Sequence, residues 1–294
     1  MTTYIKSNET EPPKKKSQWG DVWRRLKQNK SAMFGLIVIV LIVFLAIFAD
    51  FIAPYGYDDQ QLHNQFISPC WEHPFGTDNF GRDIMSRIIY GTRISLQVGF
   101  IAVGIAAVIG TGLGAIAGYY GGLVDNAIMR CIDVLLAIPS VLLAISIMAA
   151  LGQGLTKVMI AVGIGSAPSY ARVVRASVLS IREQEFIEAA RASNAGNLRI
   201  IVRYILPNAL APIIVQATLG VAGAIISAAG LSFVGLGIQP PTPEWGAMLS
   251  AGRQYFRTHW YIVTFPGLAI MLTIFALNLF GDGLRDALDP RLKD

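Results

Sequence analysis

Few residues in this chain have the types and spacing that bond-making chemistry or metal binding requires. The histidines His63, His73 and His259 form no H-E-x-x-H motif, and Cys70 with His63 and His73 matches no standard ligand spacing. We interpret that group as part of a solvated loop rather than a metal site. The sequence also lacks a G-x-x-x-x-G-K-[ST] loop, and with it the amide cradle and lysine that hold nucleotide phosphates. We therefore expect no metal, no bound cofactor and no catalytic residue in this chain.

The ionisable side chains within apolar sequence are few. Arg130 and Asp133 lie at i, i+3 spacing, where opposite charges can neutralise each other, which favours a structural pair over a proton relay. An intramembrane enzyme would need carboxylates or histidines that face one another inside the apolar segments, and the sequence argues against it. Cys70 lies in a polar loop and Cys131 near a helix end, so both are predicted to be free thiols.

The elements that must position these side chains are membrane helices. Of the 294 residues, 53% are hydrophobic and only 15% are charged, which leaves too little polar material to cover a soluble core of this size. A helix of roughly 20 apolar residues crosses a bilayer, and most of the long uncharged runs reach that length. These runs are 31–49, 94–124, 134–156, 204–242 and 258–281, with a shorter candidate at 158–171.

The net charge of +5 follows the predicted topology rather than a nucleic-acid site. Eight lysines and arginines precede the first run, which places the N-terminus in the cytoplasm. If residues 158–171 also cross the membrane, the six arginines between residues 172 and 203 and the C-terminal tail are cytoplasmic as well. Without that span the arginines would lie outside, so we predict six transmembrane helices in an all-α, multi-pass protein of the cytoplasmic membrane.

This topology divides the chain at its membrane boundaries. In the N-terminal tail, Trp19, Val22, Trp23 and Leu26 recur at helical spacing and predict an amphipathic helix on the cytoplasmic membrane surface, with a solvated basic tail as the alternative. The predicted parts are an N-terminal tail (1–30), a first transmembrane helix (31–54), an extracytoplasmic loop (55–93), a five-helix core (94–283) that contains a cytoplasmic loop (176–207), and a cytoplasmic tail (284–294).

Small residues are dense in the second and fifth predicted spans, where spacing of four allows helices to approach closely. This pattern serves either packing within the chain or a subunit interface, and the sequence leaves both open. We expect residues 220–232 of the fifth span to line a pathway. The outer segment 245–260 mixes aromatic and basic side chains, which suits contact either with a binding protein or with the membrane interface.

The cytoplasmic loop carries a short predicted helix. The sequence Ser180-Ile181-Arg182-Glu183 matches an S-x-x-E capping box and predicts a helix start. The following helix would place Phe186, Ala189, Ala190 and Ser193 on one small, mildly apolar face, as in a helix that docks into a groove of another protein. An ordinary amphipathic surface helix is the alternative. Asn194 and Gly196 both tolerate positive φ, which would end the helix.

At these residues the chain resembles a known family. The run E-A-A-R-A-S-N from Glu188 to Asn194, with Leu206 and Pro207, resembles the EAA loop of ABC-importer permease subunits, although that family usually has glycine where this chain has Asn194. Three further segments are similar to the C-type permease subunit of dipeptide and oligopeptide importers: 73–83 (H-P-F-G-T-D-N-F-G-R-D), 231–246 (L-S-F-V-G-L-G-I-Q-P-P-T-P-E-W-G) and 281–292 (G-D-G-L-R-D-A-L-D-P-R-L).

The resemblance implies a type I ABC importer permease fold whose cytoplasmic loop helix couples to an ATPase. The coupling residues it implies are Phe186, Glu188, Ala189, Ala190, Arg191, Ser193 and Asn194. It further implies a homologous permease subunit as heterodimer partner, two ABC ATPase subunits that bind ATP and Mg²⁺, an extracytoplasmic substrate-binding protein, a peptide substrate and surrounding membrane lipid. Nickel and metallophore permeases resemble the same family, so the cargo stays open between peptide and metal chelate.

Overall fold

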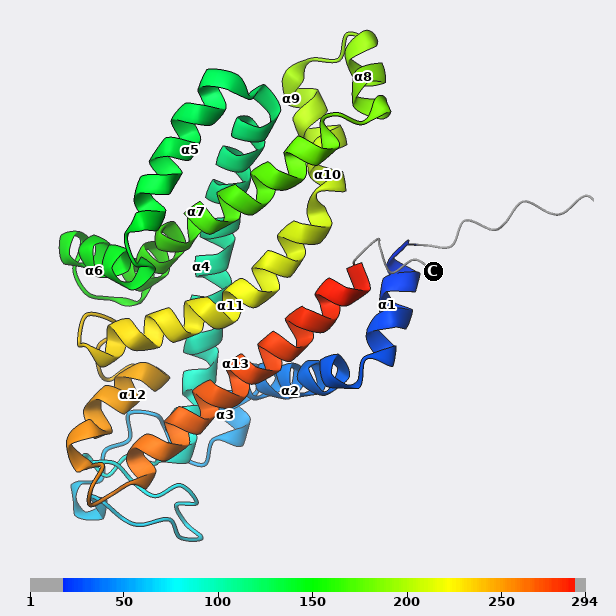
Figure 1. Cartoon of the computed structure of the whole chain (residues 1–294). Coiled ribbons are helices and arrows are strands. Elements are labelled where there is room, and N and C mark those ends of the chain that lie inside the picture. The colour runs from blue at the N-terminus through cyan, green and yellow to red at the C-terminus, as the bar shows by residue number, and fades with distance from the viewer. Residues whose placement is uncertain (1–17, 289–294) are drawn as a thin grey trace, which may run out of the picture.

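The computed structural model describes residues 18–288, and every regular element in this part is a helix (Figure 1). The elements are α1 (Gln18–Gln28), α2 (Lys30–Ile47), α3 (Ala49–Ile52), η1 (Leu62–Asn64), α4 (Ile84–Tyr120), α5 (Gly122–Ala137), α6 (Ser140–Leu151), α7 (Leu155–Ile181), α8 (Glu185–Ala192), α9 (Asn197–Ile200), the π-helical η2 (Ile201–Ile205), α10 (Leu206–Asn208), α11 (Leu210–Phe233), α12 (Trp245–Gly252), η3 (Arg253–Tyr255) and α13 (Tyr261–Leu288).

Four helices of the described part, α2, α4, α11 and α13, are long and apolar enough to cross a membrane. The helices α5 and α6 pass the same test only as a pair, and they meet at an angle of 93°. The prediction of one continuous helix over residues 134–156 is therefore wrong. Pro139 lacks an amide donor and forces Ile138 into an extended conformation (φ −90°, ψ 127°), so the helix breaks between these residues.

The short candidate at residues 158–171 is the middle of the much longer helix α7. Its 27 residues correspond to about 40 Å at 1.5 Å per residue, which exceeds the thickness of a bilayer core of about 30 Å. Arg172 and Arg175, which the sequence predicted to follow this span on the cytoplasmic side, belong to the helix itself. Asp133 of α5 pairs with Arg172 at 2.8 Å and not with Arg130, because α5 and α7 lie side by side.

The pairing of α4 with α7 explains three of the glycines in the second predicted span. A Cβ atom at Gly110 would lie 2.4 Å from the Cβ of Tyr170, and one at Gly114 would lie 2.4 Å from the carbonyl oxygen of Ala171. Gly118 continues the row with the same spacing of four residues. These glycines therefore serve packing within the chain.

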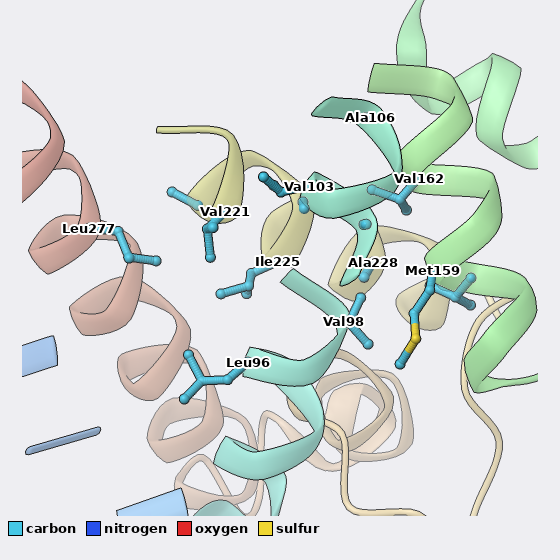
Figure 2. Close-up of a cluster of buried hydrophobic side chains, with 14 of the residues drawn as sticks. Leu96, Val98, Val103, Ala106, Met159, Val162, Val221, Ile225, Ala228 and Leu277 are labelled. Carbon is cyan, nitrogen blue, oxygen red and sulfur yellow. The ribbon is translucent and has the colours of Figure 1, made fainter. Parts of the chain in front are cut away.

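The hydrophobic core surrounds the middle of α4. Figure 2 shows its side chains meeting those of α11 and α13 on one side and those of α7 on the other. The labelled members are Leu96, Val98, Val103 and Ala106 from α4, Met159 and Val162 from α7, Val221, Ile225 and Ala228 from α11, and Leu277 from α13. The helix α2 lies against α13, where Gly35 leaves room for the backbone of Ala276. The helix α4 is thus the central element of the bundle.

The predicted N-terminal helix is present as α1, and its apolar residues are divided between two surroundings. Leu26 is buried against Ala32 of α2 and Ala287 of α13, whereas Trp23 stays exposed beneath the ammonium group of Lys27 at 5.3 Å. The basic residues before Gln18, those after Leu288 and the side chain of Trp19 lie outside the described part.

The bundle has two distinct ends (Figure 1). The long segment between α3 and α4 lies at one end together with α12, and α8, α9 and α10 lie at the other. The helix α4 runs between them, and Asp83 caps its first turn by accepting a hydrogen bond from the Ser86 amide at 2.7 Å. One continuous helix, α4, therefore connects the two ends of the bundle.

Candidate functional site

The helix α8 begins at Glu185 and not directly after the predicted N-cap Ser180. Ser180 lies in the last turn of α7, which runs to Ile181, and no side chain caps α8 at Gln184. The predicted capping box is therefore wrong, because the preceding helix already uses its serine. The electrostatics of α8 still favour a helix, since Glu185 and Glu188 lie in its first turn and Arg191 in its last.

The end of α8 matches the expectation for Asn194. This residue has φ 57°, in the left-handed region that asparagine tolerates better than most side chains. The Ala195 amide donates to the Ala190 carbonyl at 3.1 Å and the Asn194 amide donates to the Arg191 carbonyl at 2.9 Å, which together form a Schellman motif. Gly196, which also tolerates positive φ, has φ −64°, so Asn194 provides the left-handed residue of this turn.

The predicted face of α8 borders a hollow of about 420 Å³. Ala190 is buried at its base, while Phe186, Ala189 and Ser193 are exposed along it. Ile187, which lies next to Ala190 around the helix, is completely buried against the bundle. The remaining lining comes from the chain that follows α8: Asn194, Ala195, Gly196, Arg199 and Tyr204. All four residues of the predicted face thus line the same hollow. Glu188 and Arg191 are exposed beside it.

Two residues that the sequence reasoning missed attach this loop to the bundle. Arg182 donates to the Gly118 carbonyl oxygen in the last turn of α4 at 2.9 Å. The neighbouring Tyr119 is buried among Ile187 and Ala190, and the Arg191 guanidinium lies 5.6 Å from the centre of its ring. No local sequence signal identifies these residues, because their partners lie more than sixty positions away in the chain.

The return of the chain toward α11 is helical but irregular. Pro207 is the last residue of the predicted cytoplasmic loop (176–207), where the fifth span was expected to begin, and the structure has it in α10, after the π-helical turn η2. The Leu206 amide donates to the Ile201 carbonyl, and Pro207 itself has no amide to donate. The break then falls at Ala209, which lies between α10 and α11. Pro207 therefore precedes the first residue of α11 by three positions.

Comparison with known proteins identifies the architecture that carries this loop. Residues 110–294 match the family model described as binding-protein-dependent transport system inner membrane component, and residues 17–69 match the N-terminal TM domain of oligopeptide transport permease C. The chain belongs to this permease family. It is 52% identical over 277 residues to the dipeptide transport system permease protein DppC of Alkalihalophilus pseudofirmus, which covers 94% of this chain and 91% of that relative.

Two further relatives of this permease have a similar extent. The di/tripeptide transport system permease protein DppC of Pseudomonas aeruginosa is 45% identical over 280 residues, covering 93% of this chain and 92% of the relative. The glutathione transport system permease protein GsiD of Escherichia coli is 48% identical over 286 residues, covering 96% and 93%.

The fold of the permease has a counterpart among solved structures. A chain of the MetNI methionine ABC transporter, solved in inward-facing conformations, superposes with a TM-score of 0.58. The match covers 70% of this permease and 98% of that chain at 20% sequence identity. The predicted type I ABC importer permease fold is therefore confirmed.

Family membership also indicates which subunit of the importer performs which role. Permease subunits of ABC importers form the membrane path and are not themselves enzymes, so this permease works with ATPase subunits and a substrate-binding protein. It is a multi-pass membrane protein, as its apolar helices require.

The opposite end of the permease is held by buried polar contacts. His73, predicted to lie in a solvated loop, is instead buried, and its Nδ1 lies 2.9 Å from an Asp83 carboxylate oxygen. The interpretation of this histidine was wrong because the loop folds over the start of α4. In residues 18–288, no group of three or more His, Cys, Asp and Glu side chains has the geometry to hold a metal ion.

The second outer segment packs on the same surface. Trp245 is buried and donates from its indole nitrogen to the Ile88 carbonyl of α4 at 3.1 Å, so this tryptophan is not available to a partner. Glu244 caps α12 by accepting from the Gly246 and Ala247 amides, and its burial raises the pKa of the carboxyl group. Phe256 and Trp260 remain exposed at the rim.

Proposed function

We propose that this permease translocates dipeptides or oligopeptides across the cytoplasmic membrane. The support is the chemistry that its relatives share: their names specify dipeptides, di- and tripeptides, and glutathione, and all of these are short peptides. These relatives match nearly the whole chain, so the resemblance includes both ends of the bundle and the helices between them. A nickel or metallophore cargo is the alternative that the sequence left open.

The loop helix α8 is proposed as the surface that docks on an ATPase subunit. The observation that carries this is its small face of Phe186, Ala189 and Ser193, exposed around a hollow at one end of the bundle. Glu188, Ala190, Arg191 and Asn194 complete the proposed docking region. ATP and Mg²⁺ are bound by the ATPases, and their closure moves α8 as a rigid body, which switches the pathway between outward-facing and inward-facing states.

Ala190 enters this proposal in a different role from Ala189. The structure buries Ala190 against the permease itself, so a bulky side chain there disturbs the loop before it reaches a partner. Ala189 is exposed on the same face and is the more informative position for testing contact with the ATPase.

The topology we propose has six spans, which are α2, α4, the bent pair α5 and α6, α7, α11 and α13. Both termini and α8 then lie in the cytoplasm, since the arginines around α8 and the basic residues before α2 share one side. The segment between α3 and α4 and the segment around α12 lie outside, where the exposed Phe256 and Trp260 are available to a substrate-binding protein or to the membrane interface.

A homologous permease subunit is the proposed partner within the membrane. On α11, Gly223, Ile226 and Gly230 are exposed along one face, and added Cβ atoms at both glycines would meet nothing within 4 Å. An open row on the C-terminal half of α11 suits a pathway shared with a second subunit. The buried residues of the same helix, such as Ile225, hold it against α4.

The cargo is tested by uptake into proteoliposomes that contain the complete importer with its binding protein. We expect ATP-dependent accumulation of a labelled dipeptide and no ATP-dependent accumulation of radioactive nickel, alone or with a histidine chelate. Nickel uptake without dipeptide uptake would overturn the peptide proposal and would leave the permease assignment intact.

A further inference from the structure

The tip of α4 holds the loop that contains α8 at three separate positions. Gly118 accepts a hydrogen bond from Arg182, which lies before α8, and the ring of Tyr119 lies under Arg191 at the end of α8. The Tyr119 hydroxyl donates to the side-chain oxygen of Asn197, the first residue of α9, at 2.8 Å. One residue of α4, Tyr119, thus contacts the chain on both sides of the turn at Asn194.

An isolated α8 would not keep its own position. It has eight residues, and helices shorter than about 12 residues are marginal in water without tertiary contacts. Its buried contacts are Ile187 and Ala190, both in the same cluster as Tyr119. The orientation of α8 therefore depends on its contacts with the end of α4 around Tyr119.

The helix α4 extends from this contact to the opposite end of the bundle. Its 37 residues correspond to about 55 Å at 1.5 Å per residue. At the far end Asp83 caps it, and the Ile88 carbonyl accepts from Trp245 of α12. The row of glycines at 110, 114 and 118 fixes α4 against α7 along the way. A shift of the outer segments therefore reaches Tyr119 through one packed helix.

We propose that Tyr119 is a positioning residue for coupling: its hydroxyl, bonded to Asn197, sets α8 in register with α4 so that movement at the docking surface and movement of the bundle stay linked. This inference rests on the proposed docking of α8. The proposal assigns the positioning to the hydroxyl and its bond to Asn197. Removing the hydroxyl alone tests this, because the ring and its packing remain.

The test measures the number of ATP molecules hydrolysed per dipeptide imported by the assembled importer. Tyr119→Phe and Asn197→Ala are each expected to raise this ratio at least threefold, while the amount of ATPase that co-purifies with the permease stays at the wild-type level. The double variant should resemble either single variant, because both remove the same bond. Asn197→Asp keeps an acceptor oxygen and should restore the ratio to near the wild-type value.

The matched control is Tyr120→Phe, which removes the hydroxyl of the exposed neighbouring tyrosine. It should leave the ratio unchanged. Wild-type ratios in Tyr119→Phe and Asn197→Ala would overturn the proposal, and so would a loss of ATPase association with an unchanged ratio in the fraction that assembles, since that pattern marks a purely structural role. Failure of the docking proposal is distinguishable, because replacing the exposed Ala189 of α8 with Trp would then leave both the ratio and the association unchanged.

Discussion

The guanidinium of Arg175 on α7 donates to both carboxylate oxygens of Asp125 on α5, over 2.5 and 2.6 Å. The Asp125 side chain is largely buried and that of Arg175 is about two thirds buried. The pair ties the helix that leads into the α8 loop to the bent pair α5 and α6. Bidentate geometry of this kind is stronger than a single neutral hydrogen bond.

Replacing Asp125 with Asn should destabilise the permease. Arg175 loses its ionised partner, and hydrogen bonds to charged groups contribute about 1.5 to 3 kcal/mol each. We expect the Tm of the purified importer to fall by about 5 °C. The matched control is Asp133→Asn, which breaks the more exposed pair with Arg172 and should shift the Tm by no more than about 2 °C, because exposed ion pairs contribute about 0 to 1 kcal/mol. Equal Tm shifts in the two variants would contradict the larger contribution assigned to the Asp125–Arg175 pair.

Gly114→Val should prevent α4 from packing on α7. The new Cβ would lie 2.4 Å from the Ala171 carbonyl oxygen, so the two helices would have to separate. Overpacking typically costs about 1 to 3 kcal/mol, and backbone clashes cost more. Gly112→Val is the control on the same helix, since its Cβ would meet nothing within 4 Å. Expression and Tm of the two variants in detergent give the comparison, and a loss in Gly112→Val as large as in Gly114→Val would refute the packing.

Asn194 gives a conformational test of the turn after α8. Asn194→Gly removes the Cβ at a positive φ and should leave the stability unchanged or raise it slightly, whereas Asn194→Val should lower it by about 1 to 2 kcal/mol. Limited proteolysis of the loop is the measurement, with faster cleavage expected in Asn194→Val. Slower cleavage in Asn194→Val than in Asn194→Gly would show that the residue does not hold a left-handed turn.

Much of the membrane bundle could be predicted from the sequence because long apolar runs are unambiguous. The helices α2, α11 and α13 follow those runs, and so does the larger part of α4. The first turns of α4 were missed because Arg87 is a charged residue, and the sequence predicted a loop up to residue 93. In the structure it is satisfied by the Tyr57 carbonyl oxygen and lies near Asp78, so tertiary contacts permit a charge inside the helix.

The length of α7 was missed for the same reason. Arg172 and Arg175 interrupt the apolar pattern, yet each finds a carboxylate on α5. The break at Pro139 did have a local signal, and the uninterrupted apolar run around it concealed that signal. In the candidate site, the turn at Asn194 followed from local propensity, whereas the contacts of Tyr119 and Arg182 depend on which helix lies beside the loop.

The exposed face of α11 predicts a pattern of labelling. In a functional background without other cysteines, Ile226→Cys should react with a membrane-impermeant thiol reagent in at least one nucleotide state if this face lines the pathway. Ile225→Cys is the adjacent control and should stay unreactive, because Ile225 is buried against α4. Absence of labelling at residue 226 in every nucleotide state would count against a pathway on this face.

The most direct test of whether α8 docks on the ATPase compares substitutions at two alanines of α8. The readout is ATP-driven dipeptide import by the reconstituted importer. Ala189 lies on the face around the hollow and Ala192 lies off it, and both are exposed. Ala189→Trp should reduce import at least tenfold and weaken co-purification of the ATPase, while Ala192→Trp should keep import within about twofold of the wild-type rate, because surface substitutions away from an interface have small effects. Undiminished import and ATPase association in Ala189→Trp would contradict the claim that this face of α8 receives the ATPase.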